Sequence, residues 1–243
     1  MAVRKKLVRS NLFAFPGTAP GFSQGHIAAA SIYNWSAVAL GAAMVGVIGG
    51  TAGQVGTIGA GPLAAKIDSI IGPATVFTTA QSINPPALTQ LVAYQGTTFA
   101  AIVNLTNVAS GAFFSNTTSA ANGINMGPNT GALQLLVNGS FACTGSGVTV
   151  SVNVPCFVAG SYLDNTRCNF LVRRLDTGTT QTGTSTSPVL AQTTPTGGFR
   201  INRTAGGNSM AGAIAAVMMS AKYMTIPQLM AWADNPWAFW YPQ

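Results

Sequence analysis

Charged residues are scarce in this sequence, and glutamate is missing altogether. Charged residues make up 6% of the 243 positions, against roughly 25% in ordinary soluble domains. This shortage excludes a coiled coil or a charge-covered helical bundle, because both depend on Glu and Lys. A hydrophobic content of 48% and a mean hydropathy of +0.36 exclude a disordered tail. We therefore expect the chain to bury a core of its own.

Side chains suited to catalysis are few and scattered. Glycoside hydrolysis needs two carboxylates close together, and the four acidic residues lie far apart in the sequence: Asp68, Asp164, Asp176 and Asp234. The single histidine, His26, precedes them all, which excludes a triad in the order Ser, Asp, His. Asp164 beside Asn165 is the one hint of a calcium loop, and a turn-forming pair is the favoured interpretation. We predict that the protein is not an enzyme and has no metal or cofactor site.

The three cysteines, Cys143, Cys156 and Cys168, form no C-x-x-C pair. An odd number without that motif fits neither a disulfide framework nor a zinc site. We expect them to be small buried side chains that stay reduced. A Cys143–Cys156 bridge remains open, because it would join neighbouring strands.

The basic residues are concentrated at the start of the chain. The formal net charge is +7, and Arg4, Lys5, Lys6 and Arg9 all lie within the first nine positions. A nucleic-acid groove would need cations that converge on one face with interleaved aromatics. The distribution instead predicts a basic arm (residues 1–20) on a nearly neutral domain (residues 21–243), with no specific nucleic-acid partner. The apolar stretch after the basic cluster is too short for a signal peptide.

One segment resembles a membrane span. Residues 36–52 carry no charge and are mostly apolar, and their length lies near the lower limit of about 17 residues for a spanning helix. Four glycines within the segment weaken a single helix, so two buried strands joined at a glycine fit equally well. That this segment makes the chain a small membrane-associated protein is the third hypothesis for function, although we predict no membrane partner.

Short strands separated by turn residues dominate the remainder of the chain. Val148 to Val154 alternates strictly, which places four valines on one face of a strand. Asn138-Gly139 between apolar runs predicts a hairpin. Further strands are expected at 32–40, 74–80, 88–95, 98–105, 156–163, 168–175 and 199–202, and the threonine-rich segment 177–196 is expected to form an exposed hairpin or long loop. This pattern predicts an all-β sandwich or barrel.

The one clear helix signal lies near the end of the chain. Thr225 and Gln228 have the spacing of a capping box, and Pro227 falls in the first turn, where its missing N–H costs nothing. Asn235-Pro236 ends the helix. The preceding apolar run, Ala211 to Ala221, fits either a helix or a strand by periodicity.

The C-terminal stretch resembles a known family. Met210–Ser220, Met224–Leu229 and Asp234–Phe239 are similar to the close of concanavalin-A-like (laminin-G-like) domains in tailed-bacteriophage and prophage virion proteins. The resemblance extends over nearly the whole chain except the basic arm. It implies a two-sheet antiparallel jelly-roll sandwich with one short C-terminal helix, and it implies that Ala211 to Ala221 is a strand.

The resemblance also implies a function. It points to a non-enzymatic structural component of a tailed-phage virion, a capsid decoration or a tail-associated module, assembled in the host cytoplasm. Its partners would be other virion proteins and further copies of itself, and the predicted assembly contacts are Arg4, Lys5, Lys6, Arg9, Trp237, Phe239 and Trp240. A lectin module that binds a receptor or glycan at the virion surface is the alternative. The aromatic tail is expected to pack on the sandwich or to contact a neighbouring subunit. Its residues are Trp232, Trp237, Phe239, Trp240 and Tyr241.

Overall fold

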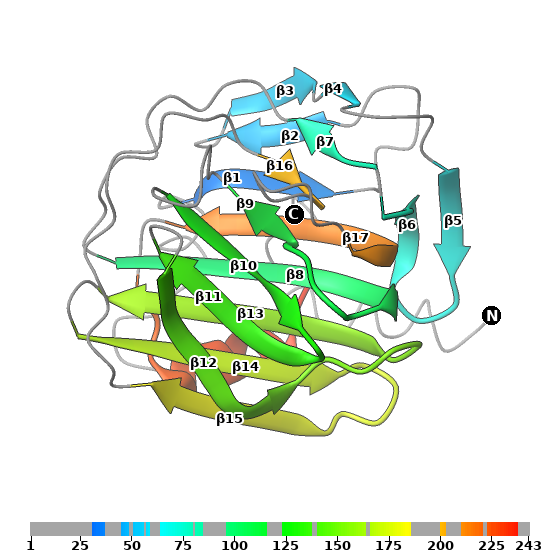
Figure 1. Ribbon diagram of the computed structural model, residues 1–243. Coiled ribbons are helices and arrows are strands. Elements are labelled where there is room, and N and C mark those ends of the chain that lie inside the picture. The colour runs from blue at the N-terminus through cyan, green and yellow to red at the C-terminus, as the bar shows by residue number, and fades with distance from the viewer. Residues whose placement is uncertain are drawn as a thin grey trace.

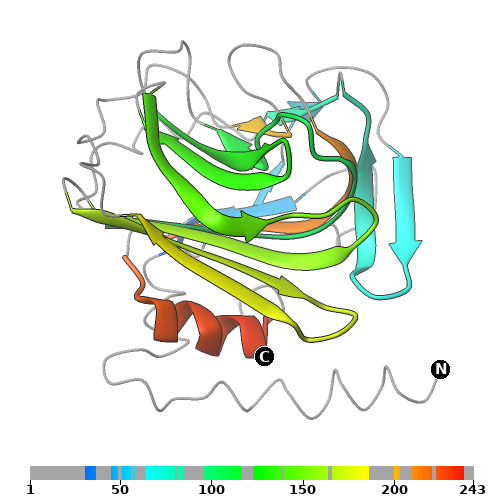
Figure 2. The same cartoon turned by 60° about the horizontal axis from the view of Figure 1, so that its bottom comes forward.

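A computed structural model describes residues 31–36, 45–48, 51–55, 57–58, 64–79, 81–84, 96–115, 123–137, 140–163, 166–185, 200–202, 210–220 and 223–237. These residues form a two-sheet antiparallel jelly-roll sandwich with one helix on its outside (Figures 1 and 2). The predicted all-β fold and its antiparallel jelly-roll architecture are confirmed. The basic arm, residues 1–20, lies outside the described residues, so the predicted division of the chain stays a prediction.

The larger sheet, sheet A, has ten strands and forms the middle layer of the molecule. Its main path runs β15-β14-β13-β8-β17-β1-β2-β3, with β6 also paired to β17 and β5 paired to β6. The strands are β1 (Ser31–Ser36), β2 (Val45–Ile48), β3 (Thr51–Val55), β5 (Ala64–Asp68), β6 (Gly72–Phe77), β8 (Gly96–Asn107), β13 (Pro155–Leu163), β14 (Arg167–Arg174), β15 (Thr180–Ser185) and β17 (Ala211–Ser220).

The smaller sheet, sheet B, has seven strands in the order β12-β11-β10-β9-β16-β7-β4. They are β4 (Thr57–Ile58), β7 (Ile83–Asn84), β9 (Phe114–Ser115), β10 (Ile124–Asn129), β11 (Ala132–Val137), β12 (Ser140–Thr149) and β16 (Arg200–Ile201). The end of β12 lies close to β15. The Thr149 backbone N–H donates to Gln181 Oε1 of β15 over 2.8 Å. The two sheets are therefore linked along one edge.

Two hydrophobic clusters lie on the two faces of sheet A. In β8, Phe99, Ala101 and Val103 face sheet B, whereas Ala100 and Ile102 face the opposite side. All five side chains are fully buried. A strand covered on both faces reads as an unbroken apolar run rather than an alternating one, which explains the continuous apolar run from Phe99 to Val103 in β8.

The helix α3 (Ile226–Asp234) covers the outer face of sheet A (Figure 2). The predicted capping box is present, and the Thr225 backbone N–H donates to Gln228 Oε1 over 2.9 Å. Trp232 is 0% exposed and packs edge-on against Phe157, with ring centroids 5.2 Å apart. For Trp232, packing on the sandwich is confirmed.

A row of polar side chains crosses sheet A beneath the segment that enters α3. Cross-strand pairing places Thr98, Ser161 and Asn169 in line. Ser161 Oγ accepts the Met224 backbone N–H over 2.7 Å, and Asn169 Nδ2 donates to the Met224 carbonyl oxygen over 2.9 Å. The row satisfies the polar backbone of a buried crossing segment, which an apolar strand face could not do.

Several predicted strands are confirmed with shifted ends, and one is wrong. The hairpin expected around Asn138-Gly139 joins β11 to β12, with Val137 opposite Ser140. The strand predicted from Val148 to Val154 does not form, because β12 ends at Thr149 and Asn153 adopts a left-handed φ of 56°. Val148 and Val150 are buried, but Val152 is 47% exposed in the turn that follows. The strand predicted at 88–95 lies outside the described residues.

The last strand and the described part of the threonine-rich segment, residues 177–185, agree with expectation, and residues 186–196 lie outside the described residues. β15 pairs with β14 as an exposed hairpin arm, and β17 confirms that the run from Ala211 is strand. The candidate membrane span, residues 36–52, includes β2 and the first two residues of β3, and these two strands pair with each other. Among the described residues, no helix has the length and apolar character needed to cross a membrane.

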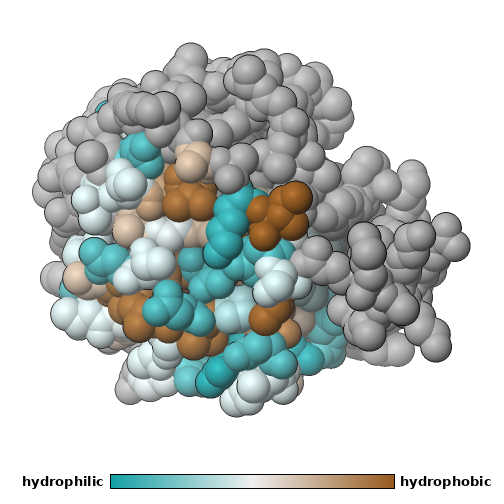
Figure 3. Space-filling model, turned by 90° about the vertical axis from the view of Figure 1, so that its right-hand side faces the viewer, coloured by the Kyte–Doolittle hydropathy of each residue, from teal (hydrophilic) through white to brown (hydrophobic). Residues whose placement is uncertain are grey.

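Among the described residues, the large exposed apolar side chains are few: Ile67, Ile70, Val152 and Met230. The β5–β6 hairpin exposes Ile67 by 72% and Ile70 by 44%. Figure 3 shows the side of the molecule on which this hairpin lies, and apolar groups are interspersed with polar ones across it. Exposed apolar side chains that are scattered in this way are normal for a protein surface.

Candidate functional site

The carboxylate of Asp68 is buried at the end of β5 and is held by polar groups of β5, of β8 and of the turn after β5. Oδ1 accepts the backbone N–H groups of Ile70 and Ile71 over 2.9 and 3.1 Å. Oδ2 accepts Asn104 Nδ2 over 2.9 Å and lies 3.3 Å from Lys66 Nζ. Asp68 is only 4% exposed. This aspartate therefore ties the β5–β6 hairpin to β8 and has a structural role.

These contacts set the acidity of Asp68. Burial alone would raise its pKa, but the hydrogen bonds from Ile70, Asn104 and Ile71, together with Lys66, outweigh burial and lower the pKa below 3.8. A carboxyl whose pKa is lower in the folded state stabilises the fold above its unfolded pKa. That stabilisation is lost as the pH falls through the folded pKa.

Replacement of Asp68 by asparagine is expected to make the free energy of unfolding less dependent on pH in acidic solution. The free energy of unfolding of the native protein should fall as the pH drops below about 4, and the D68N variant should show a shallower fall. At neutral pH, D68N should be less stable by about 1–2 kcal/mol, because a charged acceptor is lost. Urea unfolding between about pH 2.5 and 7 measures both effects, and an unchanged pH dependence in D68N would contradict the assignment.

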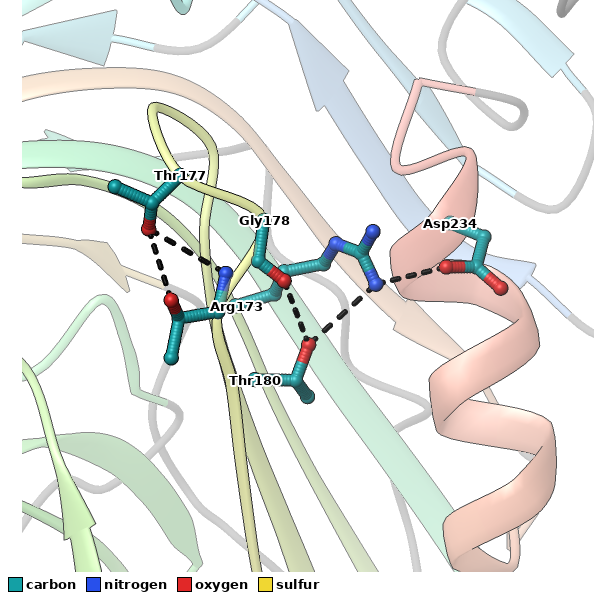
Figure 4. Close-up of polar contacts among 6 residues, drawn as sticks. Arg173, Thr177, Gly178, Thr180 and Asp234 are labelled. Carbon is teal, nitrogen blue, oxygen red and sulfur yellow. Dashed lines mark hydrogen bonds and ion pairs between the residues drawn. The ribbon is translucent and has the colours of Figure 1, made fainter.

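Asp234 forms an ion pair that connects α3 to the β14–β15 hairpin (Figure 4). Arg173 Nη1 lies 2.7 Å from Asp234 Oδ1 and also donates to Thr180 Oγ1 over 3.4 Å. Thr180 in turn donates to the Gly178 carbonyl oxygen over 3.4 Å. Asp234 is more than half exposed, so we expect the pair to contribute less than about 1 kcal/mol.

Asp176 forms a two-point contact with the neighbouring arginine. Arg174 Nε and Nη2 donate to its two carboxylate oxygens over 3.1 and 2.7 Å. The hydrogen bond from Arg174 lowers the pKa of Asp176. All three described aspartates are thus engaged in ion pairs, and Asp164 lies outside the described residues. Within the described part of the chain, no cluster of His, Cys, Asp or Glu could hold a metal ion.

The oxidation state of the cysteines differs from expectation. Cys168 is disulfide-bonded and Cys156 is a free, buried thiol. The Cys143–Cys156 pairing is therefore wrong, and so is the expectation that Cys168 stays reduced. Burial, followed by the charge of Asp176, raises the pKa of the Cys156 thiol to about 12. A thiol with so high a pKa is a poor nucleophile at neutral pH.

The outer face of sheet B carries a second set of polar side chains. Directly opposed residues in antiparallel strands share a face, and Ile201, Phe114, Met126 and Leu135 form one such row that faces the core. The adjacent row therefore faces outward. It runs from Arg200 through Ser115 and Asn125 to Leu136.

Two amides on this outer face make no hydrogen bond to the described part of the protein. Asn125 is 7% exposed and Gln134 is 9% exposed, and neither side chain takes part in the hydrogen bonds of the described residues. Arg200, half-buried at the end of the row, likewise has no ion pair among them. No polar atom of either amide is among the fully buried, unpartnered side-chain atoms of the described residues, so both amides can still exchange hydrogen bonds with water or a ligand. We call this face the amide face (Asn125, Gln134 and Arg200) and take it as the candidate site.

The predicted assembly residues are only partly described. Arg4, Lys5, Lys6, Arg9, Phe239 and Trp240 lie outside the described residues, as does His26. Trp237 is half-buried and packs against the cluster beneath α3. A contact between these residues and another subunit stays a prediction.

Sequence reasoning did not find the amide face. Asn125, Gln134 and Arg200 are ordinary polar residues in the sequence, and they are brought together only by the pairing of β16, β9, β10 and β11. No local motif marks them. An alternation of apolar Leu133 and Leu135 with polar Gln134 was the one available signal, and it indicates an outward-facing residue without indicating a site.

Comparison with known proteins supports the fold. No protein family and no curated protein matches the sequence. Domain 4 of AbnA, a GH43 extracellular arabinanase from Geobacillus stearothermophilus solved with arabinotriose, is similar at a TM-score of 0.57 and 14% identity, over 84% of this chain and 98% of that domain.

Two further solved structures are similar at low identity. The binding domain of Paraclostridial Mosquitocidal Protein 1 has a TM-score of 0.61 and 6% identity, over 87% of this chain and 53% of that one. The enzymatically active domain of bacteriophage CBA120 tailspike protein 2 has a TM-score of 0.50 and 14% identity, over 76% of this chain and 30% of that one. The chain therefore spans about half or less of these two proteins. The likeness defines the class of the chain as a jelly-roll β-sandwich module.

Proposed function

We propose that the chain is a non-enzymatic module of a tailed-phage particle, carried in the tail. The observation that carries the non-enzymatic character is that each described carboxylate already has a basic partner. Asp68, Asp176 and Asp234 each pair with a basic side chain. Hydrolysis of a glycoside needs two carboxylates that face a substrate, and the described aspartates do not supply such a pair.

Two further observations support a place in the tail. The C-terminal Asn-Pro-Trp stretch resembles the close of virion domains, and a phage tailspike domain is among the similar structures. A surface with few charges also suits a subunit embedded in an assembly, because little desolvation is required when such surfaces meet. A position in the tail accounts for both features, and capsid decoration is the other outcome of the test.

Mass spectrometry of purified particles tests this function. A tail module should be present at few copies per particle, whereas a capsid decoration protein would be present at many. Absence from the particles would contradict the proposal. The recombinant protein should also release no reducing ends from bacterial surface polysaccharides, and measurable turnover would contradict its non-enzymatic character.

Glycan binding is the second candidate function, and the amide face favours it. A carboxamide both donates and accepts hydrogen bonds, which matches the hydroxyl groups of a sugar. The domain from the arabinanase was solved with arabinotriose bound. A tail module that contacts a surface glycan would combine the two candidate functions.

A further inference from the structure

The charges of the molecule are unevenly distributed between the two sheets. The seven described strands of sheet B contain a single charged residue, Arg200. The described aspartates belong to sheet A or to elements that contact it: Asp68 ends β5, Asp176 follows β14 and Asp234 ends α3. A negatively charged ligand would therefore meet no carboxylate on the described strands of sheet B.

Arg200 supplies the positive charge of this face. Lys66, Arg173 and Arg174 each have an aspartate partner, but Arg200 has no ion pair among the described contacts. A guanidinium binds a carboxylate through two parallel hydrogen bonds. No described carboxylate pairs with Arg200, so its guanidinium can bind a carboxylate that comes from outside the described residues.

The two amides extend the site across the sheet. Asn125 lies two strands from Arg200 in the same row, with Ser115 between them, so the separation of their backbones is about 10 Å. Gln134 lies one strand further on, diagonal to Asn125. The backbone of Gly111 and Ala112 lies against Gly127, next to Gln134, and bounds the site on that side.

We propose that the amide face binds an acidic saccharide, with Arg200 on a sugar carboxylate and Asn125 and Gln134 on hydroxyl groups. This inference rests on the glycan-binding function above and adds the class of sugar and the residue that selects it. A nucleic acid is a poorer match, because its phosphate backbone calls for several cations and the described strands of sheet B supply one.

The experiment uses uronic-acid-containing bacterial surface polysaccharides, each paired with its carboxyl-reduced form. Carboxyl reduction removes the charge and leaves the sugar hydroxyls in place. The full chain should bind at least one acidic polymer, with affinity falling about tenfold to a hundredfold after reduction. The R200Q variant should show the same loss on the acidic form. R167Q is the matched control, because Arg167 is an exposed cation on β14 of sheet A, and it should bind as the native protein does.

The two amide variants separate binding from folding. In N125A and Q134A, the affinity should fall about fivefold or more, in line with the loss of one hydrogen bond to a ligand. Truncation of side chains that are 7% and 9% exposed also removes packing, so affinity is compared at a temperature at which circular dichroism shows each variant to be folded. A purely structural role would lower the melting temperature and leave the affinity of the folded protein unchanged.

The outcomes distinguish the inference from the function on which it rests. Equal binding of the acidic and reduced polymers would overturn the acidic preference and leave glycan binding intact. If R200Q, N125A and Q134A all bound the acidic polymer with native affinity, the amide face would not be its binding site. Failure to bind any polymer would overturn both the inference and the glycan-binding candidate, while the particle test would remain a separate test of the tail module.

Discussion

Replacement of Trp232 by alanine is expected to destabilise the protein by about 3–5 kcal/mol, the cost of emptying a core site filled by an aromatic ring. Trp232 is 0% exposed and is the largest fully buried side chain in the described residues. Its contact with Phe157 lies between α3 and sheet A. Loss of the ring removes the largest of the three buried side chains that α3 packs on sheet A, the others being Leu229 and Ala233.

Thermal and urea unfolding of W232A measure this cost, and the same helix offers a control. Met230 is 45% exposed, so M230A should change the free energy of unfolding by less than about 0.5 kcal/mol. If the two variants were equally stable, Trp232 would not be the anchor of α3, and the packing of the helix on sheet A would be wrong.

Replacement of Gly127 by alanine should cost about 3 kcal/mol or more. A Cβ at this position would overlap the Gly111 carbonyl oxygen and would lie 2.7 Å from Ala112 Cα. Both are backbone atoms, so the clash cannot be relieved by a side-chain rotation. Overpacking of this kind forces backbone shifts, and here it would displace the segment that leads into β9.

The control for G127A is Gly147. Gly147 has a φ of 81°, but a Cβ added there would meet no other atom within 4 Å, so G147A should lose only about 1–2 kcal/mol through its left-handed backbone. Circular dichroism with urea unfolding compares the two variants. A G127A protein as stable as G147A would show that Gly111 and Ala112 do not approach Gly127.

Local patterns in the sequence predicted those elements whose structure depends on residues that lie next to one another in the chain. Asn138-Gly139 predicted the β11–β12 hairpin because its turn preference is set by two residues. Thr225, Pro227 and Gln228 predicted the start of α3 for the same reason. The strand character of β17 required the family resemblance, because an apolar run that is buried on both faces has no distinctive period.

Local signals failed where distant contacts decide the outcome. The alternation from Val148 to Val154 is a strong strand pattern, yet β12 ends at Thr149 because Asn153 turns the chain and its N–H donates to the Leu105 carbonyl oxygen over 2.6 Å. The amide face was missed for a related reason. Arg200 and Asn125 are far apart in the sequence and meet only through the register of β9 between β16 and β10.

The roles of the aspartates were also only partly accessible. Their separation in the sequence argued against a catalytic pair, and the structure adds what each described aspartate does instead. The contact of Asp68 with Asn104 spans 36 residues, and that of Asp234 with Arg173 spans 61. Contacts of such long range are set by the fold and leave no local pattern in the sequence.

A reconstruction of the phage particle that carries this chain is the most direct measurement of its place and role. We expect density for a two-sheet sandwich in the tail, seated against other virion proteins. Density for this sandwich over the capsid shell, or its absence from every part of the particle, would contradict the account.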